Sequence, residues 1–509
     1  MITLKISKIL DMIKCNLHFS IILVSLVLLP GLCSSQEPWL DDTFSDDGMV
    51  IMNGENDASY VWDIALQPDG KILTVASGRI HRFNPDGTPD ESFGTDGIAF
   101  SNYYDFHNIA IVLQDDGKII TAGYDNNLYD YMVARFNVDG ELDTSFGDAG
   151  IVIEHVGTID RCNGLILQPD SKIIIAGYSD NNLSMLRFNN DGTLDITFGE
   201  GGKVTESFAD KTVKIEDALL LGDGKIILAG SIWIEGVFHF LLSRFNADGT
   251  LDESFATGGY TTTGVDSLYY DGYDVAIQED DKLIVAGYIG SWIEDFGMVR
   301  YHPDGSIDTE FGEDGVVITD GFGDEDQIKE ITIQPDGKII AAGYFENGMY
   351  TEFAVARYNI DGSLDNTFGD AGKLTTEFGG YGDLALSVEL QPDGKIIVGG
   401  SYYSATESEN DLVMARYIPS AVVGVENNFL TDITSIYPNP TDGNLIFDIN
   451  TELINQPIAI YNITGNLIYR EIINCNEKCQ IDVSHILPGT YFISVESSTA
   501  SLKLQFVKQ

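Results

Sequence analysis

Short apolar runs separated by Gly, Asp and Asn clusters recur along most of the chain. Examples are "VELQ" (388–391), "KIIVGG" (395–400), "YMVARF" (131–136) and "GKLTTEF" (372–378), which we name strands a, b, c and d. Strand b is almost continuously apolar, as expected for a strand covered on both faces, and no long stretch has a helical period. The pattern therefore predicts repeated units of four β-strands.

Two phrases mark seven copies of this unit. The first, apolar-x-x-Asp-x-Lys, places its lysines at positions 71, 118, 172, 225, 282, 338 and 395. The second, Asp-x-x-Phe, places its phenylalanines at positions 44, 93, 146, 198, 255, 311 and 368. Spacing of this length indicates a repeat architecture. The chain begins with the second phrase alone and ends its repeats with the first alone, so one unit is divided between the two ends.

A divided unit predicts a closed ring. The chain is expected to be all-β, with a seven-bladed β-propeller over residues 37–421. Strand d of the last blade would come from "GMVIMN" (48–53), and this N/C-terminal velcro closure would remove open sheet edges. An open solenoid is the alternative, although it does not need a split unit.

A constant spacing bears on the closure. In six units the arginine that ends strand c lies eight residues before an aspartate, as Arg82 lies before Asp90. Arg416 has no such aspartate after it, and Asp41 has no such arginine before it. We predict that each pair bridges strand c and the turn into strand d, and that Asp41 and Arg416 form the same structural pair across the closure.

The pattern "LQPDGKII.AGY…VARYN.DGSLD.TFG..G" resembles the delta-60 repeat of bacterial secreted proteins over roughly residues 40–420. The resemblance is specific in sequence. That family has no assigned activity, so it implies a fold and no reaction.

The repeats stop near Ser420. Residues 422–432 read as a linker, and alternating apolar strands over 433–509 predict a small C-terminal immunoglobulin-like β-sandwich. "YPNP" (437–440), "YN" (461–462) and "LPGTY" (487–491) closely resemble the type A C-terminal sorting domain of type IX secretion in Bacteroidota. The resemblance implies that residues 433–509 engage the secretion machinery and that the protein is exported, then held at the outer cell surface or released.

The N-terminus predicts a secretory signal peptide over residues 1–35. Lys5, Lys8 and Lys14 precede the apolar run "FSIILVSLVLLPGL" (19–32), which is short for a membrane span. The mature chain is therefore expected to have no membrane span. Only Cys162, Cys475 and Cys479 would then remain. The "CNEKC" spacing is compatible with a Cys475–Cys479 disulfide and also with two free thiols.

The strongly negative charge of the chain limits the partners that it can bind. The net charge of -51 repels nucleic acid and anionic membrane surfaces. It also attracts cations such as calcium. The "N-x-D-G-x-x-D" loops, for example Asn137, Asp139 and Asp143, offer oxygen ligands at short spacing, but they lack EF-hand spacing and equally suit capped turns. No other cofactor is indicated.

No catalytic motif is evident. Apolar residues and no helix follow the lysine of the Asp-Gly-Lys phrase, and Ser171 and Asp281 replace the glycine in two copies, so a tight hairpin turn is favoured over a phosphate loop. The histidines are scattered without a paired ligand spacing. Acidic residues are so abundant that a catalytic carboxylate pair can be neither located nor dismissed.

In a propeller the a–b and c–d turns share one face, which we call the uniform face because its phrases repeat. The d–a and b–c loops form the opposite, variable face, and functional residues concentrate on such loops. Aromatic residues there are our candidate ligand contacts: Tyr103, Tyr104, Tyr129, Trp233, Tyr269, Tyr270, Trp292, Tyr350 and Tyr402. The alternative is that they only cover the blade ends.

The sequence thus favours a secreted or cell-surface propeller that acts as a non-enzymatic binding module for a glycan or protein ligand. The alternative is a secreted polysaccharide-acting enzyme, a hydrolase or lyase, with acidic residues on the variable face.

Overall fold

The computed structural model describes two separate parts of the chain. In the first, residues 39–419 are described except 46, 53–59, 102, 104–105, 209–210, 265–267, 292, 321, 324, 347, 349 and 404–409. In the second, residues 436–508 are described except 438–440, 442, 449–456, 463–466, 473–477, 485, 487–488 and 497–500. The two compact units are Met1–Ala421 and Val422–Gln509. The predicted signal peptide (1–35) and linker (422–432) lie outside the described residues.

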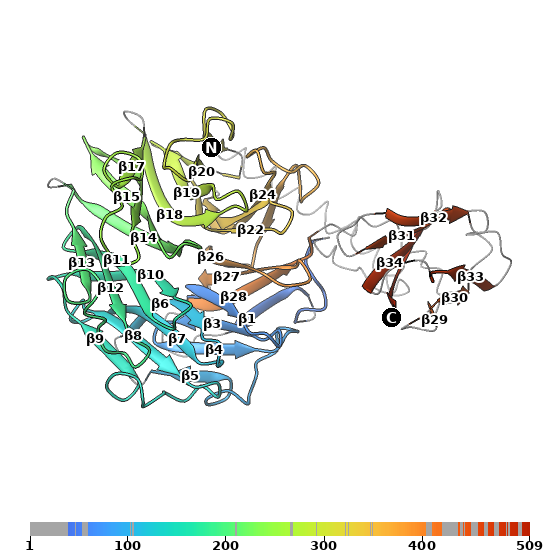
Figure 1. Ribbon diagram of the computed structural model, residues 1–509, viewed down its shortest axis with the longest axis horizontal. Coiled ribbons are helices and arrows are strands. Elements are labelled where there is room, and N and C mark those ends of the chain that lie inside the picture. The colour runs from blue at the N-terminus through green and yellow to red at the C-terminus, as the bar shows by residue number, and fades with distance from the viewer. Residues whose placement is uncertain are drawn as a thin grey trace, which may run out of the picture. The chain divides into compact units, whose positions relative to one another are not determined.

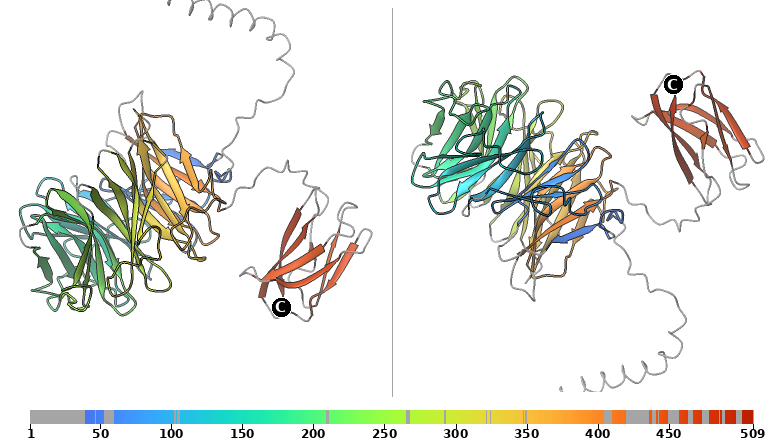
Figure 2. Two further views of the ribbon diagram at one scale, coloured as in Figure 1. Left: turned by 90° about the horizontal axis from the view of Figure 1, so that it is seen from above. Right: turned by 90° about the horizontal axis from the view of Figure 1, so that it is seen from below.

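Every element of the described residues is a β-strand, and no helix long and apolar enough to cross a membrane occurs among them. Six blades are antiparallel four-stranded sheets in which strands a, b, c and d follow in chain order (Figures 1 and 2). Blade one consists of β2 (Asp63–Leu66), β3 (Ile72–Ala76), β4 (Arg79–Phe83) and β5 (Ile98–Phe100). Blade two consists of β6 (Phe106–Leu113), β7 (Ile119–Asp125), β8 (Tyr131–Phe136) and β9 (Ile151–Glu154). Blade three consists of β10 (Asp160–Leu167), β11 (Ile173–Ser179), β12 (Asn182–Phe188) and β13 (Lys203–Glu206). Blade four consists of β14 (Val213–Leu220), β15 (Ile226–Ile234), β16 (Val237–Phe245) and β17 (Tyr260–Thr263). Blade five consists of β18 (Tyr269–Ile277), β19 (Leu283–Gly290), β20 (Glu294–Tyr301) and β21 (Val316–Thr319). Blade six consists of β22 (Asp326–Ile333), β23 (Ile339–Glu346), β24 (Thr351–Tyr358) and β25 (Lys373–Thr376).

The seventh blade joins the two ends of the repeat region. Its strands a, b and c are β26 (Gly382–Leu390), β27 (Ile396–Tyr403) and β28 (Asn410–Tyr417), and strand d is β1 (Met49–Met52) from the N-terminal side (Figure 1). β1 runs antiparallel to β28, with Met49 opposite Ala415. Arg416 Nε lies 2.9 Å from Asp41 Oδ2 beside this closure. The predicted all-β propeller with seven blades and velcro closure is confirmed.

The core lies between neighbouring blades. All residues of β8 are buried, as are nearly all those of β11. One apolar cluster holds Ile120 of blade two against Ile173 of blade three, and equivalent clusters follow around the ring. Strand b is thus covered on both faces, which explains its continuous apolar sequence.

The repeated phrases meet in one ion cluster per blade. The aspartate of Asp-x-x-Phe forms ion pairs with both the strand c arginine, at Nε–Oδ2 distances of 2.7–2.9 Å, and the lysine of the first phrase, at Nζ–Oδ2 distances of 2.7–3.4 Å. The arginine Cζ also lies 4.3–4.7 Å from the centroid of the phenylalanine ring of the same phrase. The invariant phrases on the uniform face are therefore scaffold.

Each of these arginines also reaches the next blade. Arg187 Nη1 donates to the carbonyl oxygen of Ala247 at 2.6 Å, and Arg416 Nη1 donates to that of Pro85 at 2.5 Å, from the last blade to the first. Such charge-assisted bonds are stronger than neutral ones. The uniform face therefore carries a ring of links between blades.

The a–b turn needs a left-handed residue. Five copies place Gly there, with φ near 86° at Gly70 for example. The two copies that lack Gly keep the same backbone, with φ of 63° at Ser171 and 62° at Asp281. The Asp-Gly-Lys phrase is therefore a hairpin turn, as predicted, and two blades adopt it with a residue that disfavours this region.

The C-terminal unit forms two antiparallel sheets. One contains β29 (Ile436–Tyr437), β30 (Asn444–Asp448) and β33 (Lys478–Asp482). The other has the order β32 (Leu467–Ile472), β31 (Pro457–Asn462), β34 (Gly489–Glu496) and β35 (Ser501–Lys508). The immunoglobulin-like arrangement stays a prediction. Cys475 lies outside the described residues, so the Cys475–Cys479 disulfide also stays a prediction.

Candidate functional site

The seven innermost strands surround a central cavity of about 290 Å³. All seven strands a, or the residue directly before them, contribute to its lining, from Trp62 of blade one to Leu386 of blade seven. A concave, largely preformed cavity on a rigid scaffold is the usual place for a ligand. We therefore take this cavity as the candidate site.

A β-bulge shapes the wall of the cavity. In six blades the pairing of strands a and b skips one residue of strand a, for example Asn163 between Cys162 and Gly164. The strand b residue opposite is Gly in each of these blades, and a Cβ on Gly177 would overlap the carbonyl oxygen of Arg161. Blade one has Ala76 at this position, and β2 pairs with β3 without a shift. The invariant Gly therefore admits the bulge, which is common beside functional sites.

The six bulge residues and Trp62, at the equivalent position of blade one, form a ring whose residue type differs in every blade. They lie nine residues before the repeat lysine, and we call them the throat ring: Trp62, Ile109, Asn163, Glu216, Tyr273, Lys329 and Leu386. Residues two positions earlier share the same face of strand a and lie nearer the variable face. We call these the mouth ring: Tyr60, His107, Arg161, Lys214, Asp271, Gln327 and Leu384.

Carboxylates next to the throat ring hold the strands together. The side chains of Asp63, Asp217, Asp274 and Glu330 each accept a backbone N–H from strand a of the following blade, at 2.7–3.2 Å. Burial raises the pKa of each of these carboxyl groups, that of Asp63 to about 7. Their contacts give these four carboxylates a structural role.

Three cations belong to the two rings, and one of them, Lys329, lines the cavity. Outside the repeat positions, residues 37–421 contain only Arg79, Arg161, Lys203, Lys211, Lys214, Lys329 and Lys373, and three of these seven belong to the two rings. Among the described residues, Arg161, Lys214 and Lys329 form no ion pair, whereas every repeat lysine and arginine does. In a chain with so large an acidic excess, this concentration of unpaired cations marks the cavity as a functional site.

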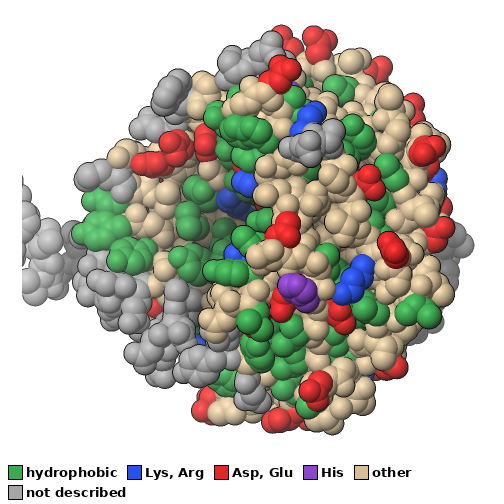
Figure 3. Space-filling model, turned by 90° about the vertical axis from the view of Figure 1, so that its left-hand side faces the viewer, with side chains coloured by type: hydrophobic (Ala, Val, Ile, Leu, Met, Phe, Trp, Pro, Cys, Tyr) green, Lys and Arg blue, Asp and Glu red, His purple; other side chains and the backbone are tan. Residues whose placement is uncertain are grey.

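Aromatic rings hold these cations in place. Arg161 Cζ lies 4.0 Å from the ring centroid of Tyr124 and 4.6 Å from that of Tyr129. Lys214 Nζ lies 4.4 Å from the ring of Phe238, and Lys329 Nζ lies 3.5 Å from the ring of Tyr273. These cation–π contacts orient the cations without neutralising their charge. Figure 3 shows a face of the molecule on which basic side chains lie inside a hollow, with acidic side chains spread around it.

Two titratable groups of the throat ring have shifted pKa values. Burial, with the nearby charge of Asp271, raises the pKa of Glu216 to about 7. Burial lowers the pKa of Lys329 to about 8, against the attraction of Glu216 and other acids. Asn163 Nδ2 donates to Glu216 Oε2 at 2.7 Å. A carboxyl group that titrates near neutral pH is chemically suited to proton transfer.

Two buried nitrogen atoms near the rings have no hydrogen-bond partner among the described residues. They are Trp62 Nε1 and His107 Nδ1, whose rings are tilted against each other at 5.1 Å. Burial lowers the pKa of His107 to about 4, so this imidazole is neutral. Buried polar atoms in native proteins are nearly always hydrogen-bonded, so these atoms are available to a polar ligand or water.

The predicted aromatic contacts have different surroundings. Tyr129 is 39% exposed beside Arg161, and Trp233 is 38% exposed, between Phe238 and Tyr269. These three predicted residues, Tyr129, Trp233 and Tyr269, therefore flank the mouth ring at blades two to five.

Other predicted contacts are tied elsewhere. The Tyr103 hydroxyl donates to Asp125 at 2.6 Å, and Tyr350 stacks on Tyr381 at 5.3 Å. Tyr402 is half-buried against the core of blade seven. The prediction that Tyr270 contacts a ligand is corrected, because this side chain is buried against Phe240 and belongs to the core. Tyr104 and Trp292 lie outside the described residues.

The loop proposed for calcium is used by the scaffold. Asp143 is buried, and its oxygens receive Arg135, Lys118 and both the N–H and hydroxyl of Ser145. Asp139 accepts the N–H of Glu141 at 3.2 Å, and Asn137 Nδ2 donates to the carbonyl oxygen of Leu142 at 3.5 Å. This geometry favours the capped-turn interpretation over calcium binding.

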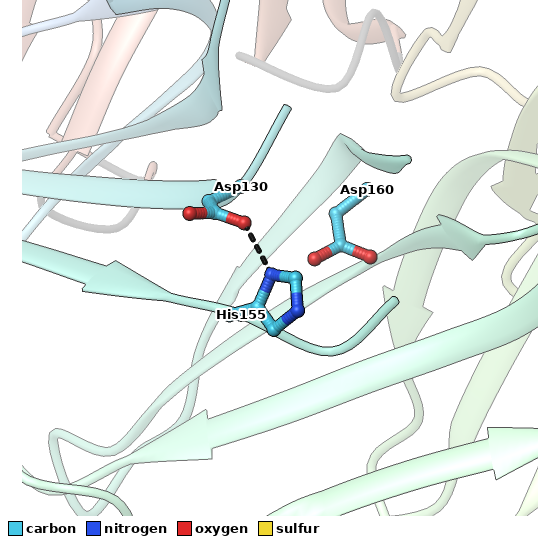
Figure 4. A group of neighbouring side chains, drawn as sticks. All are labelled: Asp130, His155 and Asp160. Atoms are coloured by element: carbon cyan, nitrogen blue, oxygen red, sulfur yellow. Dashed lines mark hydrogen bonds and ion pairs between the residues drawn. The ribbon is translucent and has the colours of Figure 1, made fainter. Parts of the chain in front are cut away.

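Asp130, His155 and Asp160 come together on the variable face, although the histidine spacing had suggested no such group (Figure 4). His155 Nδ1 lies 2.7 Å from Asp130 Oδ1. Asp160, however, accepts the N–H groups of Val156 and Gly157. Asp326 and Asp383 stand at the same repeat position and likewise accept loop N–H groups, from Phe322 and Phe378. The group is therefore explained as a loop cap with an adjacent exposed ion pair.

Comparison with family models identifies both parts of the chain. A model described as a domain of unknown function (DUF5122) β-propeller matches residues 67–93, 114–146, 168–198, 221–255, 278–311, 334–368 and 391–419. A secretion system C-terminal sorting domain matches residues 435–509. The chain is a DUF5122 β-propeller with a secretion sorting domain. The sorting domain supports export to the cell surface, and the predicted repeat and sorting resemblances are confirmed.

Solved structures resemble this chain only at low identity and low TM-score. A polysaccharide lyase, Uly1, is 9% identical with a TM-score of 0.42, and the match covers 72% of this chain and 92% of the lyase. Extracellular domains 1–2 of Drosophila Semaphorin 1a are 8% identical with a TM-score of 0.39, covering 72% and 88%. The β-propeller of Vanderwaltozyma polyspora Nup133 is 10% identical with a TM-score of 0.37, covering 72% and 100%. A search of curated proteins finds no match. These likenesses carry no inference about activity.

Sequence reasoning missed the two rings, although a signal was present. Counting back nine and eleven residues from each repeat lysine gives the throat and mouth rings directly. Their divergence among otherwise regular repeats would have singled them out.

Proposed function

We propose that this exported propeller is a non-enzymatic binding module whose ligand enters the central cavity from the variable face. The observation that carries the proposal is the set of unpaired cations, Arg161, Lys214 and Lys329, on the innermost strands. The exposed rings of Tyr129 and Trp233 lie beside the first two and offer contact area to a glycan or a protein side chain.

The carboxylates of the wall support binding rather than catalysis. Asp63, Asp217, Asp274 and Glu330 accept backbone N–H groups that close neighbouring blades together. An acid that has to move a proton during a reaction is poorly placed when the fold depends on its hydrogen bond.

Glu216 favours a second candidate, an enzyme that acts on polysaccharide. Its carboxyl group faces the cavity, has a pKa of about 7 and is held by Asn163. A group of this kind can act as a general acid or base in glycan cleavage.

A glycan-binding screen of the purified full chain, paired with a reducing-end assay, tests both candidates. Binding to an immobilised glycan that is weakened by Trp233→Ala, with no new reducing ends, supports the binding module. Reducing ends that appear with the wild type and disappear with Glu216→Gln favour the enzyme. No binding to any glycan or secreted protein would contradict both.

We also propose that residues 1–35 direct inner-membrane export and that residues 433–509 engage the type IX secretion machinery. The match over 435–509 supports the second step. Deleting 435–509 should leave the protein in the periplasm of a type IX-competent host, whereas deleting 1–35 should leave it in the cytoplasm. Surface display of both deletions would contradict the route.

A further inference from the structure

We infer that the ligand is an acidic saccharide whose carboxylate or sulfate group is bound by Arg161 and Lys214 at the mouth ring. The inference rests on the proposed function and names the chemical class of its ligand.

Arg161 and Lys214 occupy the same repeat position on adjacent blades. Both lie eleven residues before their repeat lysines, on β10 and β14, which contact each other along the cavity wall. Arg161 is held between the rings of Tyr124 and Tyr129, and Lys214 over Phe238. Arg161 Nη1 donates to the carbonyl oxygen of Asp160 at 3.2 Å, which leaves its other N–H groups, and the ammonium group of Lys214, for an anion.

The acids nearest these cations are partly neutralised or engaged. Burial raises the pKa of Glu216 to about 7, so it is partly protonated at neutral pH. Asp271 accepts the hydroxyl of Ser231, and Glu294 accepts Gln327 Nε2 at 2.5 Å. Lys329 adds a third positive charge in the throat ring. An anionic group that enters beside β10 and β14 therefore meets Arg161 and Lys214, while Asp271 on β18 is engaged by Ser231.

The other groups around the rings suit a polyhydroxylated ligand. Asn163 and Gln327 have amide groups that donate and accept, and the Tyr344 hydroxyl donates to Gln327 at 2.8 Å. The buried Trp62 Nε1 has no partner among the described residues and is a donor for a sugar hydroxyl. The exposed faces of Tyr129 and Trp233 suit sugar rings better than an acidic peptide, whose carboxylates avoid aromatic faces.

Titration calorimetry of the full chain should use four probes. They are an oligogalacturonate, a sulfated galactan oligosaccharide, a neutral galactan oligosaccharide of equal length, and a poly-glutamate peptide. We expect one of the two acidic saccharides to bind about tenfold or more tightly than the neutral one, with an affinity that falls as salt rises. The arm that binds identifies carboxylate or sulfate as the recognised group.

Arg161→Ala and Lys214→Ala should each weaken acidic-saccharide binding about tenfold, while the remote Lys203→Ala should leave it unchanged. Lys203 is the matched control because it pairs with Glu154 at 2.8 Å on the outer strands. Melting temperatures establish that the variants are folded. If one mouth variant fails to fold, the other carries the test.

Three results would overturn the inference in distinguishable ways. If the neutral saccharide binds as tightly as the acidic ones and Arg161→Ala does not weaken that binding, the acidic class of ligand is refuted and the proposed binding module is not. Preference for poly-glutamate would refute the saccharide class. Absence of binding by every probe, repeated in the wider screen above, would refute the proposed function itself.

Discussion

The uniform face and the central cavity are carried by the same seven blades, but they follow opposite rules. On the uniform face every blade repeats one lysine, one arginine, one aspartate and one phenylalanine in the same contacts, as in Lys338, Arg357, Asp365 and Phe368. In the throat and mouth rings no residue type recurs in all blades. Repetition therefore marks the residues that hold the blades, and divergence marks those that we propose to meet a ligand.

The largest expected effect is loss of a repeated arginine. Arg357→Ala would leave the buried Asp365 with the partly exposed Lys338 as its one remaining cation partner, and would remove the link to the carbonyl oxygen of Pro419. We expect the free energy of unfolding to fall by about 3–5 kcal/mol, since one partner of a buried ion pair is removed. Thermal and denaturant unfolding measure this change.

Lys203→Ala is the comparison for this variant. Its pair with Glu154 is partly exposed, so a loss of about 1 kcal/mol or less is expected. If both variants lose the same free energy of unfolding, the repeated ion clusters do not stabilise the propeller more than an ordinary surface ion pair does.

The invariant strand b glycine connects the two regions. Gly177→Ala should lower the free energy of unfolding by about 3 kcal/mol, because the new methyl group would overlap the carbonyl oxygen of Arg161. It should also weaken ligand binding by displacing Arg161 and Asn163. Gly222→Ala, in a turn with open space around it, is the control and should change neither quantity. An unchanged melting temperature for Gly177→Ala would contradict the role assigned to the bulge.

The buried carboxyl groups around the cavity should lower the free energy of unfolding at neutral pH, whereas the ion pairs of the uniform face raise it. Because the folded-state pKa of Glu216 is about 7, above its ordinary value of 4.5, the folded state holds this proton more tightly than the unfolded state. The free energy of unfolding therefore falls as pH rises from about 4.5 to about 7, on the order of 1–3 kcal/mol for this group. Asp63 and Glu389, with pKa values also raised to about 7 by burial, act in the same direction.

Glu216→Gln should therefore raise the melting temperature at pH 8 and have little effect at pH 4.5. Thermal unfolding of the variant and the wild type at both pH values checks this prediction. Destabilisation at pH 8 would mean that Glu216 is part of the scaffold.

The smallest effect concerns the two irregular turns. Asp281→Gly should increase the free energy of unfolding by about 1 kcal/mol, since Asp281 has a φ of 62° and Gly adopts this region freely. The turn lies on the uniform face, so ligand binding should not change. Reduced stability would indicate that the Asp281 side chain makes a contribution larger than the backbone strain.

The sequence alone determined the blade count, the strand order and the closure of the ring. The repeated phrases reflect local requirements within each blade. Examples are the left-handed turn at Gly70 and the ion pair between Arg82 and Asp90, eight residues apart. The predicted meeting of Asp41 and Arg416 follows from the same regularity, and the two side chains lie 2.9 Å apart.

Only the tertiary structure decided where a ligand would bind. Aromatic residues on the variable face looked alike in sequence, but Tyr270 packs in the core, whereas Tyr129 lies beside Arg161. Asn163, Glu216 and Lys329 are far apart along the chain and become neighbours because closing the ring brings seven innermost strands around one axis. Spacing within one repeat records contacts inside a blade, while a cavity shared by all blades exists only when the ring is closed.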